Sequence, residues 1–374
     1  MLVWGTGRSD LDRVIRLQVS VPSFTISCNV IEARSSISII IAAFNASQTL
    51  HKTLEAVKLS SVRPLDIIVI DDSSTEDTAA VARQHGCTVL STDRRSGPGY
   101  ARNLGAAQAQ GDVLVFLDAD VRLHGDSLRL LVAHLDDLGI GAAFGAYDEN
   151  PLDAGFFSRY RNLLHCHTHR VGRAEASTFW AGFGAIRREL FREFGGFDES
   201  YDSASIEDIE LGMRLKAAGV RIRLDPRAEA QHLKRWTFPE MSRTDIFRRG
   251  IPWTRLILKT RRMPNDLNLR WSQRVSVAAA WIALGACTGH VQLMLAALVV
   301  VAVCNGRFLG FLKERAGLSF AIGAFPVQVV FSVYCGLSLV AGTVLHLKSL
   351  MAPRKAKEVA TKPEELTEAE QEVA

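Results

Sequence analysis

The sequence predicts an α/β domain with a mostly parallel sheet, followed by a C-terminal α-helical region that spans a membrane. Through roughly the first third of the chain, short β-branched runs alternate with segments of helical pattern. Such alternation is typical of a parallel sheet covered by helices on both faces. No charged residue occurs in 275–306 or in 318–345, and uncharged stretches of this length are long enough to cross a bilayer.

The alternating segments succeed one another as strand, helix and strand. Apolar and β-branched runs predict four strands, at Ile37–Ala42, Asp66–Ile70, Cys87–Leu90 and Val113–Leu117. Helices are expected between them, at Leu50–Leu59, at Thr75–Gln84 with Ser74 as a possible cap, and at Pro98–Gln110. The fourth run contains no polar residue, which is typical of a strand buried on both faces.

Acidic and aromatic residues lie at the ends of the predicted strands, where ligands bind in sheets of this kind. The first strand leads into Ala42, Phe44 and Asn45, and the second into Asp71 and Asp72. Asp71 would be free to accept a hydrogen bond from the ring N–H of a uracil beside the face of Phe44, although either aspartate can instead cap the next helix. No GxGxxG motif follows the first strand, so a dinucleotide-binding domain is disfavoured.

Asp118 and Asp120 follow the fourth strand on alternate positions, so both carboxylates face the same side. Such a pair suits Mg²⁺ or Mn²⁺, and an ion there could also hold a diphosphate. The ion would neutralise charge on a leaving nucleotide diphosphate. An isolated DxD motif is more often a turn or a cap. Its place after the fourth strand of an alternating series favours metal binding.

A second acidic cluster opens a helix that we expect over Ser205–Ala218, with Gly219 as its stop signal. Acidic residues at a helix start are often only dipole partners. Here three of them, Glu207 and Asp208 included, occupy four positions and follow the aromatic and glycine-rich stretch 179–184. A carboxylate in this cluster could take a proton from a hydroxyl group.

Taken in order, these motifs resemble the catalytic domain of family 2 glycosyltransferases, which have the GT-A fold. The resemblance spans residues 38–237 and rests on SIIIAAFNAS, IVIDDSSTEDT, GPGYARNLGAA, VLVFLDADV, FWAGFGAIRRELFREFGGFDE, IEDIELGMRLKAAG and HLKRWT. It implies an inverting enzyme, dependent on Mn²⁺ or Mg²⁺, that moves a sugar from a nucleotide diphosphate donor. The nucleobase interpretation of Asp71 favours a UDP-sugar.

The resemblance also implies roles for individual residues. Nucleotide-sugar contacts are expected from Ala42, Phe44, Asn45, Asp71, Arg102 and Asp118. Metal ligands are expected at Asp118, Asp120 and His232, and residues of the donor or acceptor pocket at Trp180, Gly182, Arg235 and Trp236. Asp208 would be the catalytic base, supported by Glu207, whereas His165, His167 and His169 are expected to be structural.

The sequence departs from the family pattern at two places. Ala42 stands where a proline is usual after the first strand. Gln231 is followed by three residues, rather than two, before Arg235 and Trp236. The second departure favours transfer of one sugar per event over processive synthesis.

Composition divides the chain into an N-terminal extension (1–35), the catalytic domain (36–240), a basic amphipathic segment at the membrane surface (241–274), transmembrane helices (275–347) and a disordered charged tail (348–374). The segment from Lys234 to Arg274 contains 11 Lys and Arg and three acidic residues. Its net charge of +8 suits an anionic membrane leaflet. Residues 244–258 resemble an interfacial helix, and Pro252 argues against the alternative of a regular core helix. A site at the bilayer favours a lipid-linked or envelope glycan acceptor.

Val275–Cys304 would be about 45 Å long as one helix, against a hydrocarbon core of roughly 30 Å. It therefore tilts, or it breaks near Gly285 and Gly289 into a hairpin. The stretch 318–345 poses the same question, with Pro326 and Gly336 as possible break points. The N-terminus lacks the uninterrupted apolar core of a secretory signal, so we expect an inner or plasma membrane protein with a cytoplasmic catalytic domain.

Two other functions remain as alternatives. Nucleotidyltransferases share much of the fold, but they normally have a basic glycine-rich loop after the first strand, and residues 42–48 contain neither Gly nor Lys. A catalytically inactive membrane scaffold would not need the intact acidic residues. The net charge of +4 is too small to indicate a nucleic acid partner.

Overall fold

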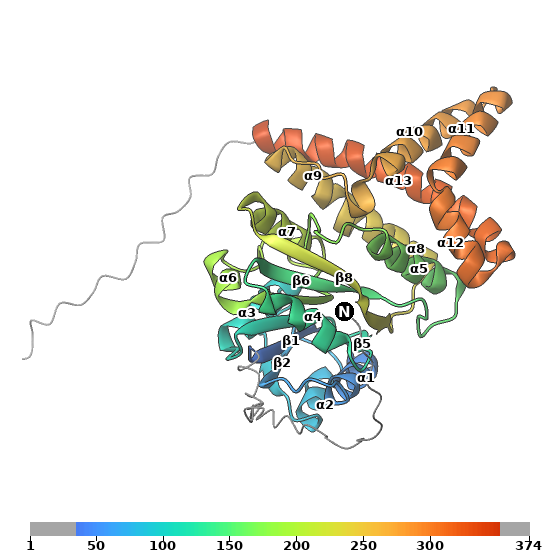
Figure 1. Ribbon diagram of the computed structural model, residues 1–374. Helices are drawn as coiled ribbons and strands as arrows, with labels where there is room; N and C mark the ends of the chain where they lie inside the picture. Colours follow the sequence, from blue (N-terminus) through green and yellow to red (C-terminus); the bar gives the residue numbers. More distant parts are fainter. Residues whose placement is uncertain (1–34, 352–374) are drawn as a thin grey trace, which may run out of the picture. The chain divides into compact units, whose positions relative to one another are not determined.

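The computed structural model describes residues 35–351, which belong to one compact unit (Figure 1). The expected N-terminal extension, 1–35, and the expected charged tail, 348–374, lie outside the described residues except for residue 35 and residues 348–351. Within the described part, an α/β domain is followed by a bundle of apolar helices, as the sequence predicts.

The α/β domain is built on one eight-stranded sheet with the order β3-β2-β1-β4-β7-β6-β8-β5. Its strands are β1 (Ile37–Ala43), β2 (Asp66–Asp71), β3 (Thr88–Ser91), β4 (Val113–Leu117), β5 (Val121–Leu123), β6 (Ile140–Tyr147), β7 (Phe183–Arg187) and β8 (Arg221–His232). The first four strands pair in parallel, as predicted. The rest of the sheet is mixed, because β7 runs antiparallel to β4 and β6, and β5 antiparallel to β8.

Eight helices of this domain are α1 (Ser47–Lys58), α2 (Thr78–Gln84), α3 (Pro98–Gln108), α4 (Ser127–Ala133), α5 (Phe156–Arg170), α6 (Arg188–Glu193), α7 (Glu207–Ala217) and α8 (Phe238–Arg243). The expectation that the second helix starts near Thr75 with Ser74 as its cap is wrong. Asn45 accepts a hydrogen bond from the Thr75 N–H and donates its own N–H to the Ser74 hydroxyl, both at 2.9 Å. These bonds hold the segment as a loop that packs against the end of β1.

Each face of the sheet carries its own apolar core. Ile39 and Ile41 belong to one core cluster and Ile40 to the other, because side chains alternate between the faces of a strand. All five residues of β4 are buried, which confirms the strand predicted from its unbroken apolar run. The carboxyl ends of β1 and β4 therefore project from a rigid base.

The C-terminal helices are the π-helix η2 (Thr244–Gly250), α9 (Ile251–Thr260), α10 (Trp271–Ala286), α11 (Val291–Cys304), α12 (Gly306–Ala316) and α13 (Leu318–Met351). The uncharged stretch 275–304 forms the hairpin that was one of two expectations, since α10 packs against α11. The break lies near Gly289, as expected, but not at Gly285, which is still inside α10. A break in the second stretch is wrong, because α13 is continuous through Pro326 and Gly336. A Cβ at Gly336 would lie 1.9 Å from the Trp281 indole nitrogen, so this glycine permits close packing of α10 on α13.

Among the described residues, α13 is the one helix that is long and apolar enough to cross a membrane by itself. The helices α11 and α12 reach the same criterion only as a pair, and they bend by 67° at their junction.

The segment 244–258, expected to be interfacial, packs as η2 and α9 against α13, and α9 and α13 lie side by side in Figure 1. Pro252 does not prevent a regular helix, because it lies in the first turn of α9, where the backbone N–H is not needed for the hydrogen bonds within that helix. Gly250 and Ser338 make the contact close, since a Cβ at Gly250 would lie 2.5 Å from the Ser338 side chain.

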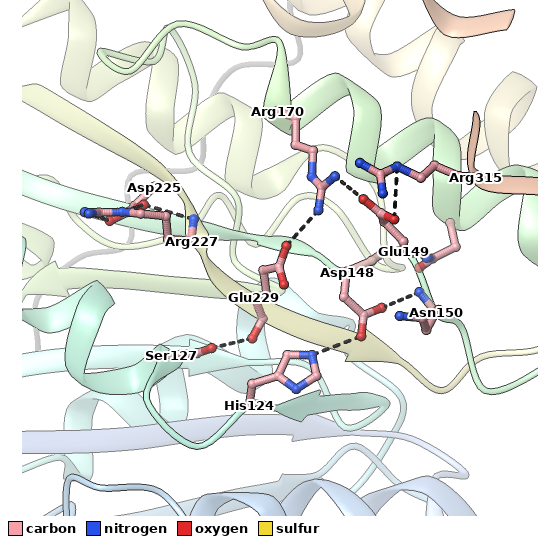
Figure 2. A network of polar contacts seen from close by, with 11 residues as sticks. His124, Ser127, Asp148, Glu149, Asn150, Arg170, Asp225, Arg227, Glu229 and Arg315 are labelled. Carbon is pink, nitrogen blue, oxygen red and sulfur yellow. Dashed lines mark hydrogen bonds and ion pairs between the residues drawn. The ribbon is translucent and has the colours of Figure 1, made fainter. Parts of the chain in front are cut away.

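Polar contacts join the helices to the α/β domain. Arg161 of α5 donates to both carboxylate oxygens of Asp245 in η2, at 2.6 and 2.9 Å, and the Tyr334 hydroxyl of α13 donates to the same group at 2.8 Å. Figure 2 shows a second connection, in which Glu149 pairs with both Arg170 of α5 and Arg315 of α12. These contacts hold η2, α12 and α13 against α5 and the loop that follows β6.

Candidate active site

A cavity of about 590 Å³ lies at the carboxyl ends of β1 and β4. The sequence-predicted residues that line it are Ala42, Phe44, Asn45, Arg102, Asp118, Asp120, Trp180, His232, Arg235 and Trp236. These residues come from separate parts of the chain, between positions 42 and 236. Because β1 pairs in parallel with β4, the residues that follow β1 and the two aspartates that follow β4 lie together at one edge of the sheet.

Arg102 connects the two acidic motifs. This arginine of α3 is 5% exposed, and it donates to Asp118 at 2.7 Å and to Glu207 at 2.8 Å. Burial raises the pKa of Asp118, and the neighbouring Asp120 carboxylate raises it further. Arg102 lowers this pKa but does not cancel the two effects, so the pKa of Asp118 stays above its usual value. The guanidinium is thus already shared between two carboxylates, and its main effect is to hold the end of β4 against the start of α7.

Asp120 and His232 face each other across the β5–β8 pair. Val121 pairs with His232 in the ladder, and the His232 Nε2 lies 3.7 Å from the nearer Asp120 carboxylate oxygen. The imidazole stacks on Tyr147, with 4.4 Å between ring centres. Burial acts to raise the pKa of Asp120, but His232 and Lys234 outweigh it and hold the pKa below its usual value. The carboxylate is therefore ionised at neutral pH and available to a cation.

No group of three or more Asp, Glu, His or Cys side chains is arranged for metal binding within residues 35–351. Asp120 and His232 nevertheless offer one carboxylate and one imidazole on the cavity wall. This donor set fits Mn²⁺ or Mg²⁺ if phosphate oxygens and water complete the coordination.

Asp208 lies at the start of α7, just behind the residues that line the cavity. Its carboxylate accepts the backbone N–H of Ala181 at 3.0 Å and that of Ile209 at 2.8 Å. Burial and the neighbouring Glu207 raise the pKa of Asp208 to about 7. A carboxyl with this pKa can accept a proton near neutral pH.

Gly182 is also outside the cavity lining, but the structure explains why it is glycine. A Cβ there would lie 2.6 Å from the indole ring of Trp180, which does line the cavity. The Gly182 carbonyl accepts the backbone N–H of Asp118 at 3.0 Å. This position therefore lets Trp180 fold back beside the acidic motif.

The two aspartates after β2 are placed differently. Asp72 lines the cavity and accepts the backbone N–H groups of Ser96 and Gly97, at 2.8 and 2.9 Å. Asp71 is buried beside it and accepts the N–H of Ser74 at 3.3 Å. Asp72 thus shapes the loop before α3, and the nucleobase contact expected of Asp71 stays a prediction.

Phe44 is 36% exposed at the mouth of the cavity, as a stacking surface requires. The Arg95 guanidinium lies over its ring, 3.9 Å from the centroid. Arg95 was not expected from the sequence, because the loop 92–97 has no pattern of its own and is brought here by Asp72.

Sequence reasoning also missed the wall opposite β1. Tyr147, His165, Arg248 and Arg249 line the cavity there, and the structural role expected of His165 stays a prediction. His167 and His169 do pack against aromatic rings, those of Phe308 and Phe311 and those of Phe144 and Trp180 respectively. The signal was the i, i+4 spacing of Arg161, His165 and His169, which places them on one face of α5.

Comparison with known proteins adds to this geometry. The family model described as Glycosyl transferase family 2 matches residues 38–195. The O-antigen chain rhamnosyltransferase RfbN of Salmonella typhimurium is 27% identical over 233 residues, which cover 58% of this chain and 74% of that protein. The pre-mycofactocin glycosyltransferase of Mycobacterium tuberculosis is 30% identical over 278 residues, 70% of this chain but only 56% of that protein.

Among solved structures, the mannosyltransferase PcManGT from Pyrobaculum calidifontis, in complex with GDP-Man and Mn²⁺, superposes with a TM-score of 0.53 at 18% sequence identity. The match covers 85% of this chain and 88% of that one, and at this identity it shows the fold. The α/β domain therefore has the GT-A fold, and residues 38–195 match glycosyl transferase family 2, a family of transferases.

Proposed function

We propose that this protein transfers one sugar per event from a nucleoside diphosphate donor to an acceptor at a membrane surface, with inversion at the anomeric carbon. One observation carries the proposal. The cavity at the carboxyl edge of the sheet is lined by an ionised Asp120, His232 and an exposed aromatic ring at Phe44, and the Asp208 carboxyl lies behind this lining, bonded to the backbone next to Trp180.

The donor is expected to stack its base on Phe44, with Asp71 as the acceptor for a uracil N–H if the donor is a UDP-sugar. Asp120 and His232, supported by Asp118, would hold the Mn²⁺ or Mg²⁺ ion that neutralises the diphosphate. The Mn²⁺ bound to the similar mannosyltransferase supports a divalent cation in this role.

Asp208 is proposed as the general base. It takes the proton of the acceptor hydroxyl as that oxygen attacks the anomeric carbon, and the bond to the donor's diphosphate oxygen breaks. The nucleoside diphosphate leaves with the bonding electrons. A single displacement of this kind inverts the anomeric configuration.

The acceptor is proposed to be lipid-linked or part of an envelope glycan. Apolar helices are packed against the domain that carries the cavity, and α13 is long enough to span a bilayer. We propose that they anchor the protein in the inner or plasma membrane, with the catalytic domain in the cytoplasm.

The test is release of nucleoside diphosphate by the full chain in membranes, from UDP-, GDP- and dTDP-sugars, with Mn²⁺, Mg²⁺ or EDTA. We expect metal-dependent release from one donor and loss of release in Asp120→Asn. Asp126→Asn is the matched control, because Asp126 is exposed, pairs with Arg129 and is not part of the cavity lining. Release that survives EDTA and Asp120→Asn would contradict the proposed metal site, and no release from any donor would contradict the activity.

A further inference from the structure

Two arginines of η2, Arg248 and Arg249, line the cavity on the side where the apolar helices attach. We call this pair the basic wall. Among residues 35–351, no carboxylate lies within ion-pair distance of either guanidinium, in contrast to Arg102 and Arg161. The hydrogen bond that Arg249 makes is to a neutral partner, the His165 ring, at 3.2 Å.

His165 does not neutralise this charge. An arginine has only donors, so the His165 Nε2 must accept the Arg249 N–H. Burial lowers the pKa of His165 well below its usual value, and Arg161 and Arg249 lower it further, so the ring is uncharged. Asp245 and Asp208 stabilise the Arg249 cation from beyond ion-pair distance, but burial and Arg161 outweigh them and lower the pKa of Arg249. An anionic ligand in direct contact would recover the free energy that this burial costs.

The basic wall is held in place from two sides. Pro252 has no N–H, so the carbonyl of Arg248, four residues earlier, cannot receive an α-helical hydrogen bond from it. The Ser205 hydroxyl, from the loop before α7, donates to that carbonyl at 2.7 Å. On the other side, Gly250 packs closely on Ser338 of α13. The two arginines are therefore fixed between the start of α7 and the apolar helix.

The basic wall comes from a different structural element than the proposed donor groups. Phe44 and Asp120 belong to the strand ends, whereas Arg248 and Arg249 belong to a helix that packs against α13. Phe247, adjacent in sequence but outside the cavity lining, is 62% exposed. An anion that carries an apolar chain would therefore have basic groups in the cavity and apolar helices beside it.

We propose that Arg248, Arg249 and His165 form a subsite for the phosphate group of a lipid carrier that presents the acceptor. The subsite deepens the proposed function and rests on it, since it names the acceptor's chemical class. It predicts that a phosphate on an apolar chain is bound through the two guanidinium groups, with the chain directed toward α9 and α13.

The experiment measures binding of farnesyl phosphate, farnesol and inorganic phosphate to the full chain in phosphatidylcholine nanodiscs by calorimetry. We expect farnesyl phosphate to bind far more tightly than the other two. Arg249→Gln should weaken the binding of farnesyl phosphate at least about tenfold, because it removes a charged hydrogen bond. Arg249→Lys should lie between, since it keeps the charge but not the planar fork. Arg243→Gln, an exposed arginine of α8 without a described partner, should change nothing.

Three results would overturn the subsite. One is equal farnesyl phosphate affinity in the wild type and Arg249→Gln. Another is inorganic phosphate binding as tightly as farnesyl phosphate, which would indicate a site for free anions. The third is equal farnesol affinity, which would indicate an apolar groove only. If Arg249→Gln fails to fold, the wild type still decides, because the proposal requires farnesyl phosphate affinity to fall with rising salt.

Binding of nucleoside diphosphate with Mn²⁺, measured in the same preparations, separates this inference from the proposed function. Arg249→Gln that loses farnesyl phosphate but keeps the nucleotide supports the subsite. A parallel loss of both ligands would assign Arg249 to the donor and overturn the subsite, with the proposed function intact. No nucleotide binding by the wild type would count against the proposed function, while the farnesyl phosphate series would still decide the subsite.

Discussion

Replacement of Arg102 by methionine tests the connection between the two acidic motifs. Arg102 and Glu207 are 5% and 4% exposed, and they are joined at 2.8 Å. Removing one partner of a buried ion pair costs about 3–5 kcal/mol, because the remaining charge stays buried and unpaired. For a domain of this size, about 2–4 °C is lost per kcal/mol, so the melting temperature should fall by at least about 6 °C.

The assay is thermal unfolding of the detergent-solubilised chain, followed by circular dichroism. Arg122→Met is the matched control, because Arg122 lies on β5 with an exposed side chain and should melt like the wild type. The double variant Arg102→Met with Glu207→Gln should recover part of the loss, since it removes the stranded charge. A melting temperature of Arg102→Met within about 1 °C of the wild type, with no gain in the double variant, would refute the reasoning.

Three further predictions follow from particular contacts. The rate of sugar transfer should fall as the pH drops below about 7, because Asp208 must be deprotonated to act as a base and its pKa is raised to about 7. Asp208→Asn should lower kcat at least about 100-fold and remove this pH dependence. A rate that does not fall below about pH 7 in the wild type would contradict the role of Asp208 as base. Gly336→Ala should destabilise the helices by about 1–3 kcal/mol, because its Cβ would meet Trp281 1.9 Å away, whereas Gly310→Ala, where the space is open, should not; equal melting temperatures would contradict the packing. Phe44→Ala should weaken nucleoside diphosphate binding by about 1–3 kcal/mol in calorimetry, and unchanged affinity would place the base elsewhere.

The sequence predicts the first half of the fold well, because each element there is set by local pattern. The runs that became β1, β2 and β4 are apolar enough to be buried whatever surrounds them. The strands β7 and β8 carry weaker signals. β8 contains Asp225 and a proline, and it is held by pairing with β6, about 80 residues earlier in the chain. Such long-range pairing leaves no mark in a local window.

The residues of the site likewise differ in whether local sequence pattern or long-range packing places them. Asp118, Asp120 and Phe44 follow directly on predicted strands, so their meeting at one edge could be expected. The basic wall could not, because Arg249 reaches His165 only through the packing of η2 on α5 and α13. The length of 275–304 alone could not distinguish a hairpin from a tilted span. The packing of α10 on α11 shows that the segment is a hairpin.

The central claim is that this site moves a sugar with Asp208 as base. It is tested most directly by single-turnover transfer of a labelled sugar to membrane lipid, with donor binding measured in the same preparations of wild type and Asp208→Asn. We expect Asp208→Asn to bind the donor normally but to transfer no label, while the wild type yields a labelled lipid product of inverted configuration. Equal transfer by both proteins, or a product that retains the donor's configuration, would contradict it.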